Sequence, residues 1–297
     1  MTRHLLDLDD LKPGELSEML DHCIRPALPQ VLAGQGAALL FEKPSVRTRH
    51  STEMAVVQLG GHPVYVQADE VGLDTRETTE DVTRTLACYH AVIGARVFDH
   101  ARLERMAGVS SVPVVNLLSE RSHPLQAVAD LLTIQDEFGG FSGRTLAWVG
   151  DYTNVARSLG LGASMLGMAV RFACPPGYGP PGVDVDRMLF HGASEVRTTS
   201  HPEDGVRDAD VVSTDAWYAM GQEAEVADRR KAFEGFTVDP SLLSLASGHA
   251  ILLHCLPVHR GEEASADAID GPASRIWPQA TNRMHAARGA LAWLLDQ

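Results

Sequence analysis

The apolar residues of the chain follow two alternating patterns. Short apolar runs predict β-strands at residues 36–42, 63–67, 91–98, 112–118, 144–151, 169–177, 210–215 and 249–257. Between many of these runs, apolar residues recur every three or four positions, which predicts amphipathic helices at residues 14–23, 46–59, 77–89, 123–140, 154–168 and 283–295. Paired glycines follow two of the helices, at residues 60–61 and 139–140, and are typical helix ends.

Strands and helices that alternate in this way predict an α/β protein in which helices cover both faces of parallel sheets. The pattern restarts near Gly139–Gly143, so we expect two doubly wound parallel-sheet domains joined by interdomain helices. Residues 1–138 would form the first, joined by the closing helix 283–297, and residues 139–282 the second. Ligands of such sheets bind beyond the carboxyl ends of the strands, so the segments that follow strands are the candidate sites.

Composition narrows the function further. The chain of 297 residues has 25 Lys plus Arg against 39 Asp plus Glu, a net charge of -14. This balance disfavours nucleic-acid binding, which depends on neutralising phosphates with Lys and Arg. No apolar run approaches the ~20 residues of a membrane span, and no secretory signal is recognisable. The four cysteines are widely spaced without a CxxC pair, which favours reduced thiols in the cytoplasm.

The segment FEKPSVRTRHSTE, at residues 41–53, concentrates positive charge in this acidic chain. A predicted strand ends there, and Ser45 is placed to cap the following helix. The free N–H groups of a first helical turn, with Arg47, Ser45 and Thr48 beside them, suit a phosphate group. The alternative is an ordinary cap with surface arginines, but two arginines in a first turn oppose the helix dipole unless an anion offsets them. We therefore interpret the segment as an anion site.

Three other segments that follow strands carry candidate chemistry. His123 and Gln126 in SHPLQ share one helical face, although a capping histidine before a first-turn proline explains the motif equally well. Asp215 follows the apolar run VVST and could receive a substrate ammonium, or simply cap a helix. The stretch HCLPVHRGEE, at residues 254–263, offers metal-ligating side chains but neither CxxC nor HExxH, so we expect no metal there.

Together these segments resemble the aspartate/ornithine carbamoyltransferase family, in order and over nearly the whole chain. Five family motifs carry the resemblance: S-T-R-T-R, which is SVRTR at 45–49; H-P-x-Q at 123–126; N-N, which is TN at 153–154; D-x-W-x-S-M-G, which is DAWYAMG at 215–221; and H-C-L-P-x-H-R-G-E-E at 254–263. The fourth and fifth are specific to the ornithine branch. Arg96 and Arg283 also stand where the family has arginines of the donor site.

The resemblance implies transfer of a carbamoyl group from carbamoyl phosphate to the δ-amine of L-ornithine, giving L-citrulline and phosphate for arginine biosynthesis. It implies a homotrimer, with residues 1–138 binding carbamoyl phosphate and 139–282 binding ornithine. No cofactor is expected, because phosphate is already a good leaving group. The implied catalytic residues are Arg47, Arg96, His123 and Cys255. Carbamoyl-phosphate contacts are implied for Ser45, Val46, Arg47, Thr48, Arg96, His123, Gln126, Cys255, Leu256 and Arg283. Ornithine contacts are implied for Asn154, Asp215, Ala219 and Met220.

Three positions depart from the family pattern. Val46 replaces a Thr, Gly72 falls where the ornithine branch has a Gln that reaches the donor site, and Ala219 replaces a Ser. These changes leave two alternatives open. One is a carbamoyltransferase for another amine, such as putrescine or a modified ornithine. The other is a non-catalytic homologue that binds carbamoyl phosphate or a partner protein.

Overall fold

The computed structural model describes residues 2–218 and 223–296, and it divides into two compact units. Unit 1 consists of residues 1–132 and 281–297, and unit 2 consists of residues 133–280. The chain passes from one unit to the other twice, each time within a helix. The first of these helices is α6 (Pro124–Phe138) and the second is α13 (Ile276–Leu295).

Unit 1 is built on parallel strands in the order β2-β1-β3-β4 among the residues described. The strands are β1 (Gly36–Phe41), β2 (His62–Gln67), β3 (His90–Arg96) and β4 (Val114–Leu118). β1 pairs with both β2 and β3, and Phe41 lies opposite Arg96 in the ladder. The direction in which the chain adds strands therefore reverses between β1 and β3, where α/β sheets bind ligands at the strands' carboxyl ends.

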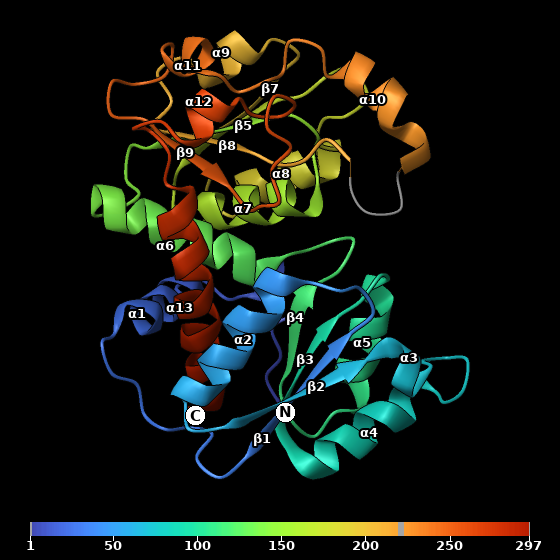
Figure 1. Ribbon diagram of the computed structural model, residues 1–297. Coiled ribbons are helices and arrows are strands. Elements are labelled where there is room, and N and C mark those ends of the chain that lie inside the picture. The colour runs from blue at the N-terminus through green and yellow to red at the C-terminus, as the bar shows by residue number, and fades with distance from the viewer. Residues whose placement is uncertain (1, 219–222, 297) are drawn as a thin grey trace. The chain divides into compact units, whose positions relative to one another are not determined.

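Helices cover both faces of this sheet (Figure 1). The helices of unit 1 besides the two shared ones are α1 (Glu15–Ile24), α2 (Val46–Gln58), α3 (Ala68–Val71), α4 (Thr79–Tyr89) and α5 (His100–Val109), with the short η1 (Leu8–Asp10). Leu40 and Ile93 of the sheet pack with Leu103 and Met106 of α5 in one apolar cluster. α2 lies over the opposite face in Figure 1.

Unit 2 repeats the plan with parallel strands in the order β7-β6-β5-β8-β9 within its described residues. The strands are β5 (Thr145–Val149), β6 (Ala169–Ala173), β7 (Glu195–Thr199), β8 (Val211–Thr214) and β9 (Ile251–His254). Here the reversal falls between β5 and β8. The helices that belong wholly to unit 2 are α7 (Asn154–Met165), α8 (Gly182–Phe190), α9 (Pro202–Val206), α10 (Val226–Ala232), α11 (Pro240–Leu243) and α12 (Ala266–Ile269), with η2 (Glu223–Glu225).

The core of unit 2 also has a layer on each face of its sheet (Figure 1). Ala147 and Val212 face a cluster that includes Phe233 and Ile269. On the other face, α7 packs closely because Gly160 has no side chain: a Cβ there would lie 2.8 Å from the ring of Phe172. Two parallel sheets covered by helices confirm the predicted fold class.

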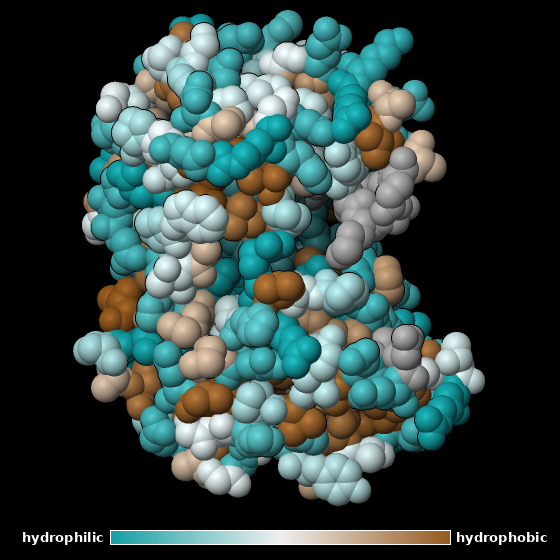
Figure 2. Space-filling view, viewed as in Figure 1, coloured by the Kyte–Doolittle hydropathy of each residue, from teal (hydrophilic) through white to brown (hydrophobic). Residues whose placement is uncertain are grey.

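No helix in residues 2–218 and 223–296 is long and apolar enough to cross a bilayer. On the face shown in Figure 2, apolar residues are scattered among more numerous polar ones.

Candidate active site

The first turn of α2 begins directly beyond β1, on the side of the sheet where the strand order reverses. Ser45 is extended, with φ of -159°, and its Oγ accepts the N–H of Thr48 at 3.3 Å. The turn carries no acidic side chain, and Val46 and Arg47 are both exposed on it. Free N–H groups and a cation at a helix start attract an anion, so the predicted phosphate-binding segment has the required local structure.

Arg96 ends β3 beside this turn. Its Nη1 lies 3.5 Å from Oγ1 of Thr48, and both side chains are buried. Lys43 lies close by, and its pKa is lowered by burial and by the positive charge of Arg96. The carboxyl ends of β1 and β3 therefore gather cations around Thr48.

His123 precedes α6 and is buried among further cations. Burial, followed by the positive charges of Arg283 and Arg96, holds the pKa of this imidazole well below its usual value. His123 is therefore neutral near pH 7 and can donate a hydrogen bond through one ring nitrogen. Arg283 comes from α13 and is buried as well. The structure thus brings Thr48, Arg96, His123 and Arg283 together within unit 1.

Gln126 lies one turn into α6 and is also buried. Its Nε2 donates to Oδ1 of Asp130 at 2.7 Å. Because this bond uses the amide nitrogen, the carbonyl oxygen of Gln126 is the atom that can accept a hydrogen bond from a ligand.

In unit 2, Asp215 and Cys255 follow the adjacent strands β8 and β9. The Cys255 Sγ lies 3.2 Å from Asp215 Oδ1, which also accepts the N–H of Ala216 at 2.8 Å. Burial raises the pKa of the Asp215 carboxyl, although the hydrogen bonds from Cys255 and from the Ala216 N–H act in the opposite sense. A thiol and a carboxylate are therefore held together at the carboxyl edge of this sheet.

His254 fixes the backbone that carries Cys255. Its Nδ1 accepts the N–H of Leu256 at 2.9 Å, so its Nε2 carries the proton and faces Oε1 of Glu263 at 3.3 Å. Oε1 of the fully buried Glu263 also accepts the N–H of His259 at 2.6 Å. Leu256 has a left-handed φ of 61°, and the peptide bond to Pro257 is cis. The hydrogen bonds of His254 and Glu263 fix the position of this segment.

Asn154 begins α7, where β5 ends, and Oγ1 of Thr153 caps this helix. Nearby, Asp151 accepts a hydrogen bond from Nη1 of Arg229 at 2.7 Å. Burial raises the pKa of Asp151, and the charge of Asp215 adds to that shift. Asp151 and Asp215 therefore share one electrostatic environment. The two remaining predicted ornithine contacts, Ala219 and Met220, lie outside the described residues.

Three residues of this region, Asp151, Arg229 and Glu263, were given no role from the sequence. Glu263 stands within the quoted 254–263 motif, so that motif was a signal for it. Asp151 and Arg229 are 78 positions apart, and local sequence carries no sign of their pairing.

Two groups of side chains in unit 2 could in principle ligate a metal. Ligand atoms lie within 4.8 Å of one another in Asp215, His254 and Cys255, and likewise in His259, Glu262 and Glu263. In the first group these atoms already serve in the hydrogen bonds described above. In the second group, Oε1 of Glu262 is held by Arg230 at 2.6 Å and Tyr218 at 3.2 Å, and Oε1 of Glu263 by His254 and the backbone N–H of His259.

Comparison with known proteins agrees with this geometry. Residues 3–136 match the "Aspartate/ornithine carbamoyltransferase, carbamoyl-P binding domain", and residues 142–294 match the "Asp/Orn binding domain" of the same family. The chain belongs to the aspartate/ornithine carbamoyltransferase family. The second match includes α13, whose residues from 281 onward pack with unit 1 instead.

Relatives of the carbamoyltransferase family cover the chain from end to end. The ornithine carbamoyltransferase of Acidothermus cellulolyticus is 47% identical over 100% of this chain and 97% of its own length. The solved ornithine carbamoyltransferase of Pyrococcus furiosus superposes with a TM-score of 0.93 at 40% identity, covering 99% of this chain and 97% of that one. A solved N-acetyl-L-ornithine transcarbamylase is also similar, with 28% identity, a TM-score of 0.89, and coverage of 98% and 99%.

Proposed function

We propose that this carbamoyltransferase transfers the carbamoyl group of carbamoyl phosphate to the δ-amine of L-ornithine, producing L-citrulline and phosphate for arginine biosynthesis. The observation that carries the proposal is the cluster of two cations, Arg96 and Arg283, with Thr48 and neutral His123 beside the first turn of α2. The relatives named ornithine carbamoyltransferase support the choice of acceptor.

The donor is bound by unit 1 in this proposal. Ser45, Val46, Arg47 and Thr48 hold the phosphate through the first-turn N–H groups, the hydroxyls and the guanidinium, and Arg283 adds charge. Arg96 and neutral His123 donate to the carbonyl oxygen and stabilise the negative charge that grows there in the transition state. The carbonyl oxygen of Gln126 accepts from the carbamoyl NH2 group. We assign donor binding to residues 1–138 with 283–297, and ornithine binding to 139–282.

The acceptor must attack as a neutral amine. A primary alkylamine has a pKa near ~10.4, so only a small fraction is neutral at pH 7. Removal of water beside Cys255 favours the neutral form. Asp215 and Asn154 orient the amino acid, together with Ala219 and Met220. The nitrogen lone pair then forms the new C–N bond, the C–O bond to phosphate breaks, and the amine gives up one proton. Cys255 positions the amine and relays this proton to the departing phosphate oxygen, without forming a covalent intermediate.

The direct test is citrulline formation by the purified protein from ornithine and carbamoyl phosphate. Production well above that of the Arg47→Ala and Cys255→Ala variants supports the proposal. A panel of acceptors that includes putrescine and N-acetylornithine is measured alongside, because one similar structure is of an N-acetyl-L-ornithine transcarbamylase. If another amine turns over much faster than ornithine, the assigned acceptor is wrong. Tight binding of carbamoyl phosphate without turnover of any amine would indicate a non-catalytic homologue.

We also propose that the enzyme is a cytoplasmic homotrimer. Apolar residues exposed along α2, namely Val46, Met54 and Val57, support burial of this helix against another subunit. Cys23, Cys88, Cys174 and Cys255 form no disulfide with one another, which supports a reducing compartment. Light scattering should give a mass three times that of the 32.0 kDa chain.

A further inference from the structure

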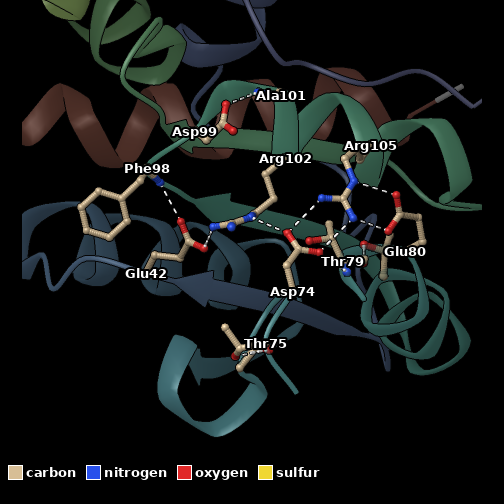
Figure 3. Close-up of polar contacts among 12 residues, drawn as sticks. Glu42, Asp74, Thr75, Thr79, Glu80, Phe98, Asp99, Ala101, Arg102 and Arg105 are labelled. Carbon is tan, nitrogen blue, oxygen red and sulfur yellow. Dashed lines mark hydrogen bonds and ion pairs between the residues drawn. The ribbon is translucent and has the colours of Figure 1, made fainter. Parts of the chain in front are cut away.

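Five charged side chains form a continuous ion-paired chain beside the donor site of unit 1 (Figure 3). We call the set Glu42, Arg102, Asp74, Arg105 and Glu80 the charge chain. Arg102 pairs with Glu42 through Nη1 and with Asp74 through Nε at 3.2 Å. Arg105 binds Asp74 with two hydrogen bonds of 2.9 Å and Glu80 with bonds of 2.7 and 2.6 Å. The chain therefore links the end of β1 to α5, to the loop before α4, and to α4 itself.

Glu42 is the member that touches the framework of the donor site. It follows β1 and precedes Ser45 by three residues. Its backbone N–H donates to the carbonyl oxygen of Arg96 at 2.8 Å, and its Oε2 accepts the N–H of Phe98 at 2.7 Å. Glu42 therefore contacts the backbone on both sides of Val97, directly after β3 ends at Arg96. The same residue leads into the first turn of α2.

The two carboxylate oxygens of Glu42 have separate partners. Oε2 holds the backbone of Phe98, whereas Oε1 faces the guanidinium of Arg102. The Glu42 side chain is only 6% exposed, and a carboxylate so buried is costly unless an opposite charge pairs with it. Arg102 provides that charge. The hydrogen bond between Glu42 and the Phe98 N–H therefore depends on Arg102, which holds the other carboxylate oxygen.

Asp74 in turn fixes Arg102. Asp74 has a left-handed φ of 59° in the loop before α4, and its Oδ1 accepts the N–H of Thr79 at 3.1 Å. The hydrogen bonds from Arg105 are the main cause that lowers the pKa of the Asp74 carboxyl, and hydrogen bonds from Arg105 likewise lower the pKa of Glu80. Asp74 and Glu80 therefore stay ionised over the ordinary pH range, and they tie Arg102 and Arg105 of α5 to α4 and to the loop before it.

We propose that Glu42, held by the charge chain, is a positioning residue for carbamoyl phosphate that sets the spacing between the first turn of α2 and Arg96. The ligand in this inference rests on the proposed function. Ordinary ion pairs on a protein surface contribute little to stability. The near-complete burial of Glu42 and its two bonds around Arg96 place it apart from such pairs.

Three substitutions test the proposal. Glu42→Gln keeps an oxygen for the Phe98 N–H but removes the charge that Arg102 pairs with. Arg102→Gln removes the same pair from the other side. Asp74→Asn keeps a residue that tolerates a left-handed φ while weakening the hold on both arginines. The matched control is Asp81→Asn, which breaks the exposed Asp81–Arg84 pair on α4.

Carbamoyl-phosphate affinity is measured by calorimetry, and KM for each substrate, kcat and Tm are measured on the same preparations. We expect Glu42→Gln and Arg102→Gln each to raise Kd and KM for carbamoyl phosphate about tenfold, the loss typical of a hydrogen bond to a charged group. KM for ornithine should change by less than about twofold, because only donor binding is affected.

The double variant Glu42→Gln with Arg102→Gln should have the same Kd as either single variant, because both substitutions remove the same ion pair. Asp74→Asn should shift Kd in the same direction, and Asp81→Asn should not shift it.

An unchanged Kd in folded Glu42→Gln and Arg102→Gln, with only a lower Tm, would overturn the positioning role. If one of these variants does not fold, the other and Asp74→Asn decide by the same criterion. Wild-type protein that binds carbamoyl phosphate but makes no citrulline would refute the proposed function and still leave Kd to judge Glu42. Wild-type protein that binds no carbamoyl phosphate would overturn both.

Discussion

The thiol of Cys255 lies 3.2 Å from the Oδ1 atom of Asp215, at the carboxyl ends of two adjacent strands. In the proposed reaction, this pair receives the amine. Cys255→Ala should lower kcat about 100-fold, within the range for losing a proton-handling group. Cys255→Ser should retain part of the activity, because a hydroxyl can still donate to Asp215. Steady-state assays of citrulline measure both, and wild-type kcat in Cys255→Ala would exclude the assigned role.

Replacing Asp215 should separate stability from activity. Burial raises the pKa of this carboxyl, so the folded state binds a proton more readily than the unfolded state. The free energy of unfolding therefore falls as pH rises from the unfolded-state pKa through the higher folded-state pKa. Asp215→Asn removes this cost near pH 7 and should raise the free energy of unfolding there while turnover falls.

The stability gain should narrow as pH decreases toward the ordinary aspartate pKa of about 3.9, where both states become neutral. Urea unfolding at pH 7 and pH 5 measures the effect. A gain that does not depend on pH would point to a different cause.

His123 should make stability depend on pH in the opposite direction. Its pKa is well below the ordinary value because it is buried beside Arg283 and Arg96. Below pH ~6.5 the unfolded chain takes up a proton that the folded chain resists, so stability falls as pH decreases. His123→Gln should reduce this slope between pH 7 and pH 5.5, although His100, whose pKa is also lowered, retains part of it. Identical slopes in the variant and the wild type would contradict the assignment.

Arg47 should affect donor binding without affecting stability, because it is exposed on the first turn of α2. Arg47→Lys keeps the charge but loses the planar fork that matches a phosphate. We expect KM for carbamoyl phosphate to rise about tenfold in Arg47→Lys and further in Arg47→Gln. Both variants should keep the wild-type Tm. A lower Tm with an unchanged KM would indicate that Arg47 is structural.

Two helical glycines in unit 1 should respond to alanine in opposite ways. A Cβ on Gly289 of α13 would lie 2.7 Å from Cα of Cys23 in α1. Gly289→Ala should therefore lower the free energy of unfolding by about 1–3 kcal/mol. Gly108 is exposed in α5, and a Cβ added there would meet no atom of the described residues within 4 Å. Gly108→Ala should raise that free energy by up to about 1 kcal/mol. Chemical denaturation of both variants measures the contrast.

The sequence predicted most strands of the two sheets because these are compact apolar runs, whereas β7 is largely polar and exposed. Among the longer helices it missed α5 and α8. In α5 only Leu103 and Met106 carry the apolar signal, and in α8 Met188 is the buried position. The last helix was placed at residue 283, whereas α13 begins at Ile276. A proline usually marks the end or interruption of a helix, so Pro278 favours a later start. In the structure Pro278 lies in the first turn of α13, where the N–H that a proline lacks would be unpaired in any residue.

The candidate site was predictable where one segment supplies several of its residues. Thr48 lies in the 45–49 motif, where α2 begins, and His123 lies in the 123–126 motif, where α6 begins. The partners that tune these groups come from distant segments. Arg102 meets Asp74 28 positions away, and Asp151 meets Arg229 78 positions away. Such pairings depend on the order of strands in the sheet, which a single sequence does not specify.

Unit 1 is discontinuous in the chain, and this has a consequence for synthesis on the ribosome. Domains generally fold as units, with the N-terminal one first. Here the last part of the N-terminal unit, residues 281–297, is translated only after all of unit 2. Ala286, Ala290 and Leu291 of that segment are buried, so the nascent N-terminal unit lacks these core residues until translation ends. Unit 2, which is contiguous, can finish its core earlier. Chains truncated near residue 280 should therefore contain a protease-resistant fragment from the second half of the sequence rather than from the first.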